Sequence, residues 1–280
     1  MWCQAPRPGY HCAWGEPLKI HSPAIWVACL GLSFGAHAAG ATQVYFAVGQ
    51  STGNDLRTGT PTCTVNGTTL TFSEAQNHPG LGVGCKVTYA GASVCYLSHK
   101  TSSTVWSCVN GQGAAPPQAT GATVNSIRRA FASLQEALTG SMGPGFLNTS
   151  DLVTGNFVLN IPCYNDSGPD TTPASIGDGF TTGTLNYIRV YTPTDTATEC
   201  NQSQRHDGKW NDARYRFAVP NYADWSLLIV AANVRVDGLQ ISNPSLNNNY
   251  SRAVVANYAE RGEVQFSNNI IRGGGRRTRP

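Results

Sequence analysis

A ten-residue phrase that occurs twice constrains the fold of this chain more than any other feature. It reads NVRVDGLQIS at 233–242 and EVQFSNNIIR at 263–272, thirty residues further on. Each copy alternates apolar residues, turns at Gly or Asn, and has an isoleucine at its ninth position, which is typical of two short strands joined at a corner. A further apolar segment precedes each copy, 227–230 before the first and 253–256 before the second, at an offset of 26 residues.

The repeat predicts that successive copies stack in parallel. A unit of two short strands cannot bury its inward side chains alone, so neighbouring units pack on one another, with strands about 4.8 Å apart. The predicted inward positions are Val234, Val236, Leu239 and Ile241 in the first copy and Val264, Phe266, Asn269 and Ile271 in the second. An asparagine at such a corner is expected to hydrogen-bond to the backbone of the turn. A plain sandwich whose strands share a pattern by chance is the alternative.

The composition favours strands over helices. Charged residues make up 12% of the 280 residues and hydrophobic residues 40%, so a folded all-β chain is expected rather than a disordered one. Four arginines (Arg272, Arg276, Arg277 and Arg279) fall in the last nine residues, and the rest of the chain has 15 basic residues (19 minus 4) against 16 acidic ones. A near-neutral body predicts no nucleic-acid partner. Residues 273–280 are interpreted as a solvated or non-native basic tail.

The amino terminus has the pattern of an export signal. The apolar run AIWVACLGLSFG at 24–35 follows Arg7 and Lys19 and is too short to span a bilayer comfortably. The small-x-small triplet AHA at 36–38 predicts cleavage after Ala38, so residues 1–38 are assigned as a signal peptide. An uncleaved hydrophobic leader is the alternative. The predicted location is secreted or cell surface, with no membrane span after signal removal.

Six cysteines follow the predicted cleavage site. An even number in an exported chain permits disulfides, although the sequence leaves their pairing open. Buried free thiols are the alternative. No two cysteines have the spacing of a zinc site, so no metal ligation by them is predicted. The six are Cys63, Cys85, Cys95, Cys108, Cys163 and Cys200.

The rest of the chain divides into a β-rich module, a linker and the region with the repeat. Residues 39–110 contain short alternating segments, and Asn66–Gly67 stands between two of them, which predicts a hairpin in a small antiparallel sheet or barrel. The Pro- and Gly-rich stretch 111–121 is interpreted as a linker. Residues 122–272 are then expected to contain one helix followed by parallel strands.

The expected helix is defined by one apolar stripe. Asn125 or Ser126 is a candidate amino-terminal cap, and Gly140 is a candidate end. A lone amphipathic helix in an all-β chain is expected to cover the open end of a sheet stack. The stripe consists of Ile127, Ala130, Phe131, Leu134 and Leu138.

Three of these segments together resemble a known fold. SIRRAFASLQEAL, VRVDGLQI and VQFSNNII resemble the amino-terminal part of right-handed parallel β-helix proteins with the pectate-lyase-like fold, which include secreted bacterial surface proteins. The resemblance covers roughly residues 122–272. It implies an all-β fold: a right-handed parallel β-helix with an amino-terminal capping helix, preceded by a small antiparallel β module. Because such folds have many coils and two are evident here, the chain is interpreted as a truncated amino-terminal portion.

The densest polar segment is QSQRHDGKWNDARYR at 202–216. His206 beside Asp207 suggests a base with an orienting carboxylate, and Lys209 is a further catalytic candidate. The alternative is a solvated loop whose charges pair with one another. The cations Arg205, Lys209 and Arg214 suit an acidic sugar, and Trp210 and Tyr215 are candidates to stack on a sugar ring. The substrate-binding candidates are therefore Arg205, Trp210, Asp212, Arg214 and Tyr215.

Metal binding has weaker support. Asp166, Asp170 and Asp178 lie in one Gly- and Pro-rich loop that suits Ca²⁺ chemistry, but ordinary turn chemistry explains them equally well. No other cofactor is predicted. The sequence leaves two functions open: an adhesive, structural or glycan-binding protein whose partner is a polysaccharide or cell-surface glycan, or a polysaccharide lyase or glycoside hydrolase of the pectate-lyase-like fold.

Overall fold

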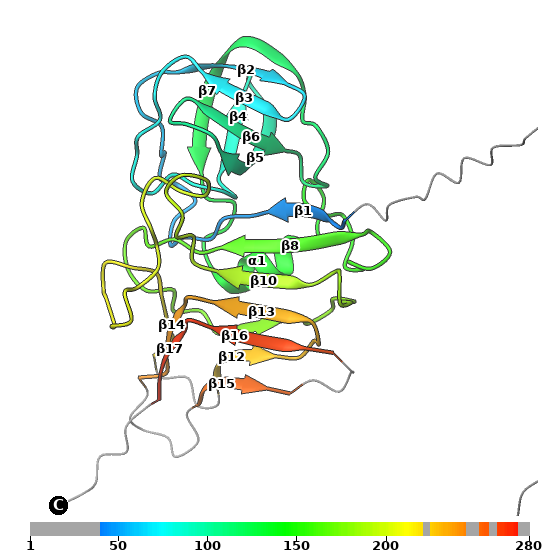
Figure 1. Cartoon of the computed structure of the whole chain (residues 1–280), viewed down its shortest axis with the longest axis vertical. Helices are drawn as coiled ribbons and strands as arrows, with labels where there is room; N and C mark the ends of the chain where they lie inside the picture. The colour runs from blue at the N-terminus through cyan, green and yellow to red at the C-terminus, as the bar shows by residue number, and fades with distance from the viewer. Residues whose placement is uncertain (1–39, 221–224, 245–251, 258–261, 274–280) are drawn as a thin grey trace, which may run out of the picture. The chain divides into compact units, whose positions relative to one another are not determined.

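The computed structural model describes residues 40–220, 225–244, 252–257 and 262–273. The predicted signal peptide and the residues after Gly273 lie outside this part of the chain. The described residues form seventeen strands and one helix. They are organised as one closed antiparallel barrel and three parallel sheets (Figure 1).

Six strands close into an antiparallel barrel. The Asn66–Gly67 hairpin is confirmed, because Asn66 pairs with Thr69 and Gly67 has a φ of +60°. The barrel core is built around Trp106, which is fully buried. In barrel order the strands are β2 (Thr62–Asn66), β3 (Thr69–Phe72), β6 (Val105–Val109), β5 (Ser93–Lys100), β4 (Lys86–Tyr89) and β7 (Ala119–Arg128).

The other strands are all parallel to their neighbours. One five-stranded sheet contains β1 (Thr42–Tyr45), β8 (Phe157–Pro162), β10 (Ile188–Tyr191), β13 (Val234–Asp237) and β16 (Val264–Ser267) in that order. A second sheet contains β11 (Arg216–Ala218), β14 (Gln240–Ser242) and β17 (Ile270–Arg272). The third contains β15 (Arg252–Ala256), β12 (Trp225–Ile229) and β9 (Ala174–Ile176).

The two copies of the repeated phrase pair in parallel, as predicted. Val234 is opposite Val264, and Ile241 is opposite Ile271. The preceding strands also pair, but Leu227 is opposite Val254, so their offset is 27 residues rather than the predicted 26. The predicted corner bonds of Asn269 are confirmed: its Oδ1 accepts from the backbone N–H of Leu239 at 2.8 Å, and its Nδ2 donates to the carbonyl of Val236 at 2.8 Å.

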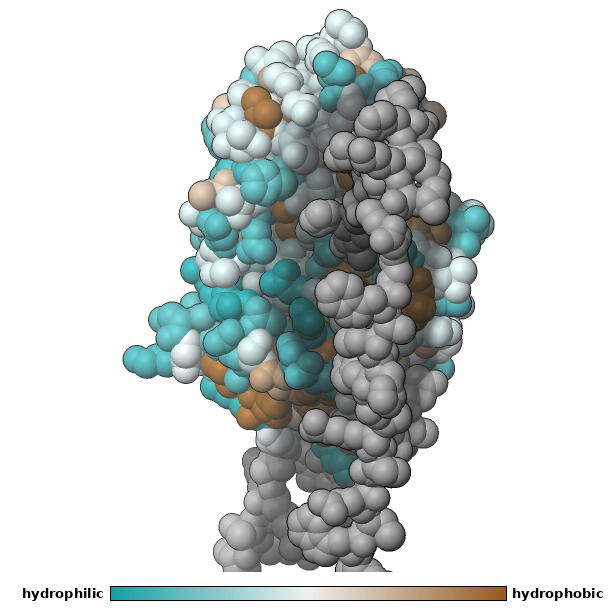
Figure 2. Space-filling view, turned by 45° about the vertical axis from the view of Figure 1, so that its right-hand side comes forward, coloured by the Kyte–Doolittle hydropathy of each residue, from teal (hydrophilic) through white to brown (hydrophobic). Residues whose placement is uncertain are grey.

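Burial differs between the two copies. The four predicted inward residues of the first copy are completely buried, whereas Phe266 and Ile271 in the second are 39% and 52% exposed. They lie on β16 and β17, which form the edges of their sheets. Figure 2 shows apolar surface gathered toward one end of the face it draws, while much of the remaining visible surface is hydrophilic or neutral.

The predicted fold class is wrong. A right-handed parallel β-helix does not describe the chain, because its sheets are a mixture of parallel and antiparallel pairings that includes a closed six-stranded antiparallel barrel. The repeat reports only local stacking of β12 to β17. It carries no information on the long-range pairing of β1 with β8, strands that precede and follow the barrel in the sequence. The structure is all-β, with three parallel sheets and one closed antiparallel barrel.

The predicted helix is also largely wrong. Residues 119–128 form β7, where Ile127 lies opposite Val87 and Asn125 accepts a hydrogen bond from Gly91 N–H instead of capping a helix. The stretch is rich in Thr, Val and Ile, which favour strands. The helix that does form, α1, is Leu134–Gly140, with Ser133 as its cap accepting from Glu136 N–H at 3.1 Å.

An aromatic cluster joins the barrel to the parallel sheets. The ring of Phe46, just after β1, meets Tyr96 of β5 edge-on at 4.8 Å and Phe146 at 5.1 Å. Phe131 stacks on Phe146 at 4.7 Å. These rings belong to the same buried cluster as the cores of the parallel sheets. Burial of aromatic surface therefore holds the barrel against the rest of the described chain.

The backbone also makes close contact at this junction, and Gly84 allows it. Gly84 has a φ of +81°, and its carbonyl accepts from Ala47 N–H at 2.9 Å. A Cβ on Gly84 would lie 2.5 Å from the Ala47 nitrogen and 2.7 Å from Pro162 Cγ. Gly91 has nearly the same φ, +84°, but a Cβ there would meet nothing within 4 Å.

Comparing Gly84→Ala with Gly91→Ala isolates the steric part of this contact. Both substitutions carry the strain of a positive φ, so we expect the Gly84 variant to lose about 1–3 kcal/mol more free energy of unfolding. Urea denaturation followed by circular dichroism measures the difference. Equal losses of unfolding free energy in the two variants would show that the junction accommodates the added methyl group without destabilisation.

Candidate functional site: an amide-lined cleft

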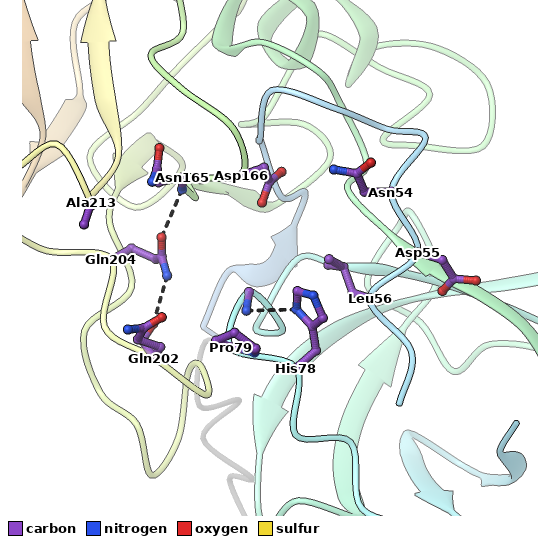
Figure 3. A pocket seen from close by; sticks show the side chains of 11 residues that line it. Asn54, Asp55, Leu56, His78, Pro79, Asn165, Asp166, Gln202, Gln204 and Ala213 are labelled. Carbon is purple, nitrogen blue, oxygen red and sulfur yellow. Dashed lines mark hydrogen bonds between the residues drawn. The ribbon is translucent and has the colours of Figure 1, made fainter. Parts of the chain in front are cut away.

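A polar cleft of about 450 Å³ lies where loops of the barrel meet loops of the parallel sheets. Residues 54–56 precede β2 and residues 78–80 connect β3 to β4. On the other side, residues 165–166 follow β8, and residues 202–213 lie between β10 and β11. Figure 3 shows Asn165, Gln202 and Gln204 on one side of this space and Asn54 and Leu56 on the other.

Hydrogen bonds hold the amides on one wall of the cleft. Gln204 is 4% exposed, its Oε1 accepts from Asn165 N–H at 3.0 Å, and its Nε2 donates to the Gln202 carbonyl at 3.0 Å. Only the backbone N–H of Asn165 takes part in these bonds. Its side-chain Oδ1 is buried without a hydrogen-bond partner among the described residues. An unpaired buried acceptor is costly. A ligand hydroxyl or a water molecule would relieve that cost.

A buried ion pair supports the cleft. Arg129 donates to both oxygens of Asp166, with a shortest distance of 2.6 Å, and the two side chains are 1% and 6% exposed. The Arg129 guanidinium also lies 3.9 Å from the ring centre of Tyr164, and its Nη1 lies 3.1 Å from Cys85 Sγ. Although Asp166 lines the cleft, its charge is therefore matched within the protein.

His78 is a neutral member of the lining. Its Nδ1 accepts a hydrogen bond from Gly80 N–H at 3.1 Å. Burial lowers the pKa of the imidazole, and the nearby positive charge of Arg129 lowers it further. A histidine with a depressed pKa is uncharged at neutral pH. Asp55 is a second carboxylate of the lining, and it pairs with Arg57 at 2.8 Å. The lining thus presents amides, a neutral imidazole and two paired carboxylates, which suit hydrogen bonding to an uncharged polar ligand.

The predicted catalytic residues do not form an acid–base pair. His206 Nδ1 accepts from Gly208 N–H at 3.1 Å, and its Nε2 is buried without a partner among the described residues. Asp207 and Lys209 are exposed. The side chains of His206 and Asp207 share no hydrogen bond in the described structure, because a turn at Gly208 directs the imidazole back onto its own loop.

The predicted substrate-binding residues are occupied by contacts within the protein. Arg205 pairs with Asp237, Arg214 donates to the Ser203 carbonyl, and Trp210 donates to Asp212 Oδ1 at 3.0 Å. Asp212 also pairs with Arg216 at 3.0 Å, and Arg272 stacks on the Trp210 ring at 4.1 Å.

Tyr215 differs from the stacking residue that the sequence suggested. It is fully buried, and its hydroxyl donates to Asp170 Oδ2 at 3.2 Å. It therefore packs in the core and presents no ring to a ligand.

The three aspartates considered for Ca²⁺ are not brought together as ligands. Asp166 pairs with Arg129, and Asp170 accepts from Leu134 N–H at 2.7 Å and Thr172 N–H at 3.1 Å. Asp178 is exposed. Within the described ranges, no group of three or more His, Cys, Asp or Glu side chains is arranged to hold a metal ion. Backbone capping explains Asp170, whose pKa burial raises.

All six cysteines of the described region are free and buried, so this structure has buried thiols where the sequence also permitted disulfides. Burial raises the pKa of Cys63 to about 11 and that of Cys200 to about 12. A thiol with a raised pKa is a poor nucleophile. These side chains act as small core residues in this structure.

Sequence reasoning singled out only Asp166 among the lining residues, and as a metal candidate; Gln202 and Gln204 lie in the polar segment 202–216 but were not named as candidates. Asn165 follows β8 and Gln204 follows β10, two adjacent parallel strands, so their loops leave the same edge of the sheet. That signal was available once parallel pairing was predicted. Asn54 and His78 come from the barrel side, and the sequence held no sign that barrel loops would face these two.

Comparisons with protein-family models, with curated proteins and with solved structures found no match to this chain. The resemblance to pectate-lyase-like proteins therefore gains no support from related proteins. Among the described residues, no helix combines the length and apolar character needed to cross a membrane.

Proposed function

We propose that the protein is an extracellular glycan-binding protein and that the amide-lined cleft is its binding site. The observation that carries the proposal is the unpaired, buried Oδ1 of Asn165 in a cleft of about 450 Å³. A cleft of this size falls in the usual range for small-molecule sites. The Asn165 side chain has to turn toward the cleft to expose this oxygen, and a ligand hydroxyl would then supply the missing donor.

Amide side chains suit a sugar because they both donate and accept. Each Asn or Gln offers one carbonyl acceptor and two N–H donors, and a sugar hydroxyl offers one donor and acceptor lone pairs. Four amides contribute to the lining: Asn54, Asn165, Gln202 and Gln204. Asp166 is neutralised by Arg129, Asp55 pairs with Arg57, and His78 is uncharged, so the site favours a neutral sugar over a charged one.

The extracellular part of the proposal depends on the sequence. The apolar run at 24–35 and the AHA triplet support export, and both lie outside the described residues. An adhesive role at the cell surface is compatible with binding that involves no turnover.

Binding is tested with short neutral gluco-, manno-, xylo- and galacto-oligosaccharides by isothermal titration calorimetry. We expect saturable binding to at least one series. Asn165→Ala and Asn54→Ala should each weaken it about tenfold, because each removes one hydrogen bond of roughly 1.4 kcal/mol. Gln265→Ala, an exposed amide on β16 far along the sheet order from the cleft strands, is the matched control.

Two results would overturn the proposal. One is the absence of saturable binding across the panel. The other is equal affinity in the two cleft variants and the Gln265→Ala control. The same samples are assayed for new reducing ends, because their release would show a catalyst rather than a binding protein.

A further inference from the structure

A second cleft, of about 340 Å³, lies on the outer face of the barrel. Lys86 on β4 pairs with Arg128 on β7, and Thr88 pairs with Ser126 in the next outward-facing row. Residues two apart on a strand share a face, so two cations and two hydroxyls form a block of four neighbouring side chains. Val87, between the two β4 residues, and Ile127, between the two β7 residues, point the other way and are completely buried in the barrel.

The two cations of this block lack a counter-charge. Neither Lys86 nor Arg128 makes an ion pair or a side-chain hydrogen bond with another described residue. Like charges directly opposite one another on paired strands destabilise a sheet. The arrangement is therefore unfavourable in the free protein, and an anion placed between the two side chains would relieve it.

The other residues of the lining do not cancel this charge. Arg129 is paired with Asp166. Glu136 lies at the cleft, and its Oε2 accepts from Ala132 N–H at 2.7 Å. Two cations against one carboxylate leave a net positive cleft, to which Thr52 adds a third hydroxyl.

We propose that this cleft binds a tetrahedral oxyanion, a sulfate or phosphate group, between Lys86 and Arg128. Guanidinium and ammonium groups form strong charge-assisted hydrogen bonds to such oxygens. The hydroxyls of Thr88, Ser126 and Thr52 are donors for the remaining oxygens. This site is separate from the amide-lined cleft, so it stands whether or not that cleft binds a glycan.

The group has two possible sources, a free ion or a sulfated sugar. Inorganic sulfate, inorganic phosphate and N-acetylglucosamine 6-sulfate are therefore titrated separately, with acetate as a carboxylate, all at constant ionic strength. Binding is followed by amide chemical shifts in ¹⁵N-labelled protein, which also locate the site. We expect saturable shifts in β4 and β7 with sulfate and phosphate, and weaker binding of acetate.

The variants decide whether the paired cations form the site. Lys86→Gln and Arg128→Gln should each weaken sulfate binding about 10- to 100-fold, the loss expected for a hydrogen bond to a charged group. Arg252→Gln, which removes an exposed arginine on β15, should leave it unchanged, as should Asn165→Ala in the amide-lined cleft. Tighter binding of the sugar sulfate than of inorganic sulfate identifies a sulfated glycan as the source, and the reverse identifies a free ion.

Three results of the sulfate titrations would overturn the proposal: shifts that do not saturate, shifts spread over the surface instead of β4 and β7, or an equal effect of Arg252→Gln. Acetate binding as tight as sulfate binding would also contradict it, because the site would then recognise a carboxylate. Loss of oligosaccharide binding alone would leave it intact.

Discussion

Replacing Asp166 by asparagine is expected to lower the free energy of unfolding by about 3–5 kcal/mol, the cost of breaking a buried ion pair by removing one partner. The substitution preserves the shape of the side chain but leaves the Arg129 guanidinium, which is 1% exposed, without its counter-charge. Arginine cannot shed its proton to escape this position. Thermal and urea denaturation measure the loss.

Asp212→Asn is the matched control for this prediction. It makes the same chemical change in the pair between Asp212 and Arg216, where the Asp212 side chain is 74% exposed. Exposed pairs contribute little, so its effect should be small. The double variant Arg129→Met, Asp166→Leu removes both charges and should recover part of the loss. A loss for Asp166→Asn no larger than that for Asp212→Asn would contradict the argument.

Replacing Phe46 by alanine should be comparably destabilising, at about 3–5 kcal/mol. The ring is completely buried and contacts Tyr96, Phe131 and Phe146 at the junction of the barrel and the parallel sheets. Its removal eliminates both apolar burial and edge-on ring contacts. The measurement is the urea midpoint, together with amide hydrogen exchange in β1 and β5, where protection should fall first.

Phe266→Ala tests whether burial is the cause. Phe266 lies on β16 and is 39% exposed, so the same truncation should cost much less there. Similar losses at the two positions would mean that the aromatic cluster at the junction contributes no more than an exposed ring.

Short-range patterns in the sequence predicted the local structure well. The Asn66–Gly67 turn defined its hairpin, and the alternation around Val234 and Val264 defined a parallel pairing with the correct register. Both follow from residues close in sequence or from a direct repeat. The bonds of Asn269 to the Leu239 turn followed from the same repeat.

Patterns that fit two periods, or that depend on distant partners, were misread. Ile127 belongs to an apolar stripe with helical spacing and also to a strand, and its neighbours in the barrel decided for the strand. The fold class failed because nothing local indicates that β1 pairs with β8. The partners of two substrate-binding candidates also lie far along the chain: Arg205 pairs with Asp237, and the Tyr215 hydroxyl donates to Asp170.

The pairing of β1 with β8 makes the barrel an insertion within a sheet, and this has a consequence for folding order. Thr42 and Phe157 are opposite one another although 115 positions separate them, so closing that loop in an unfolded chain carries a large entropic cost. A folded barrel shortens the loop, because its first and last strands in the sequence, β2 and β7, pair with Thr62 opposite Thr123. The barrel is therefore expected to fold first, with β1 joining its sheet late.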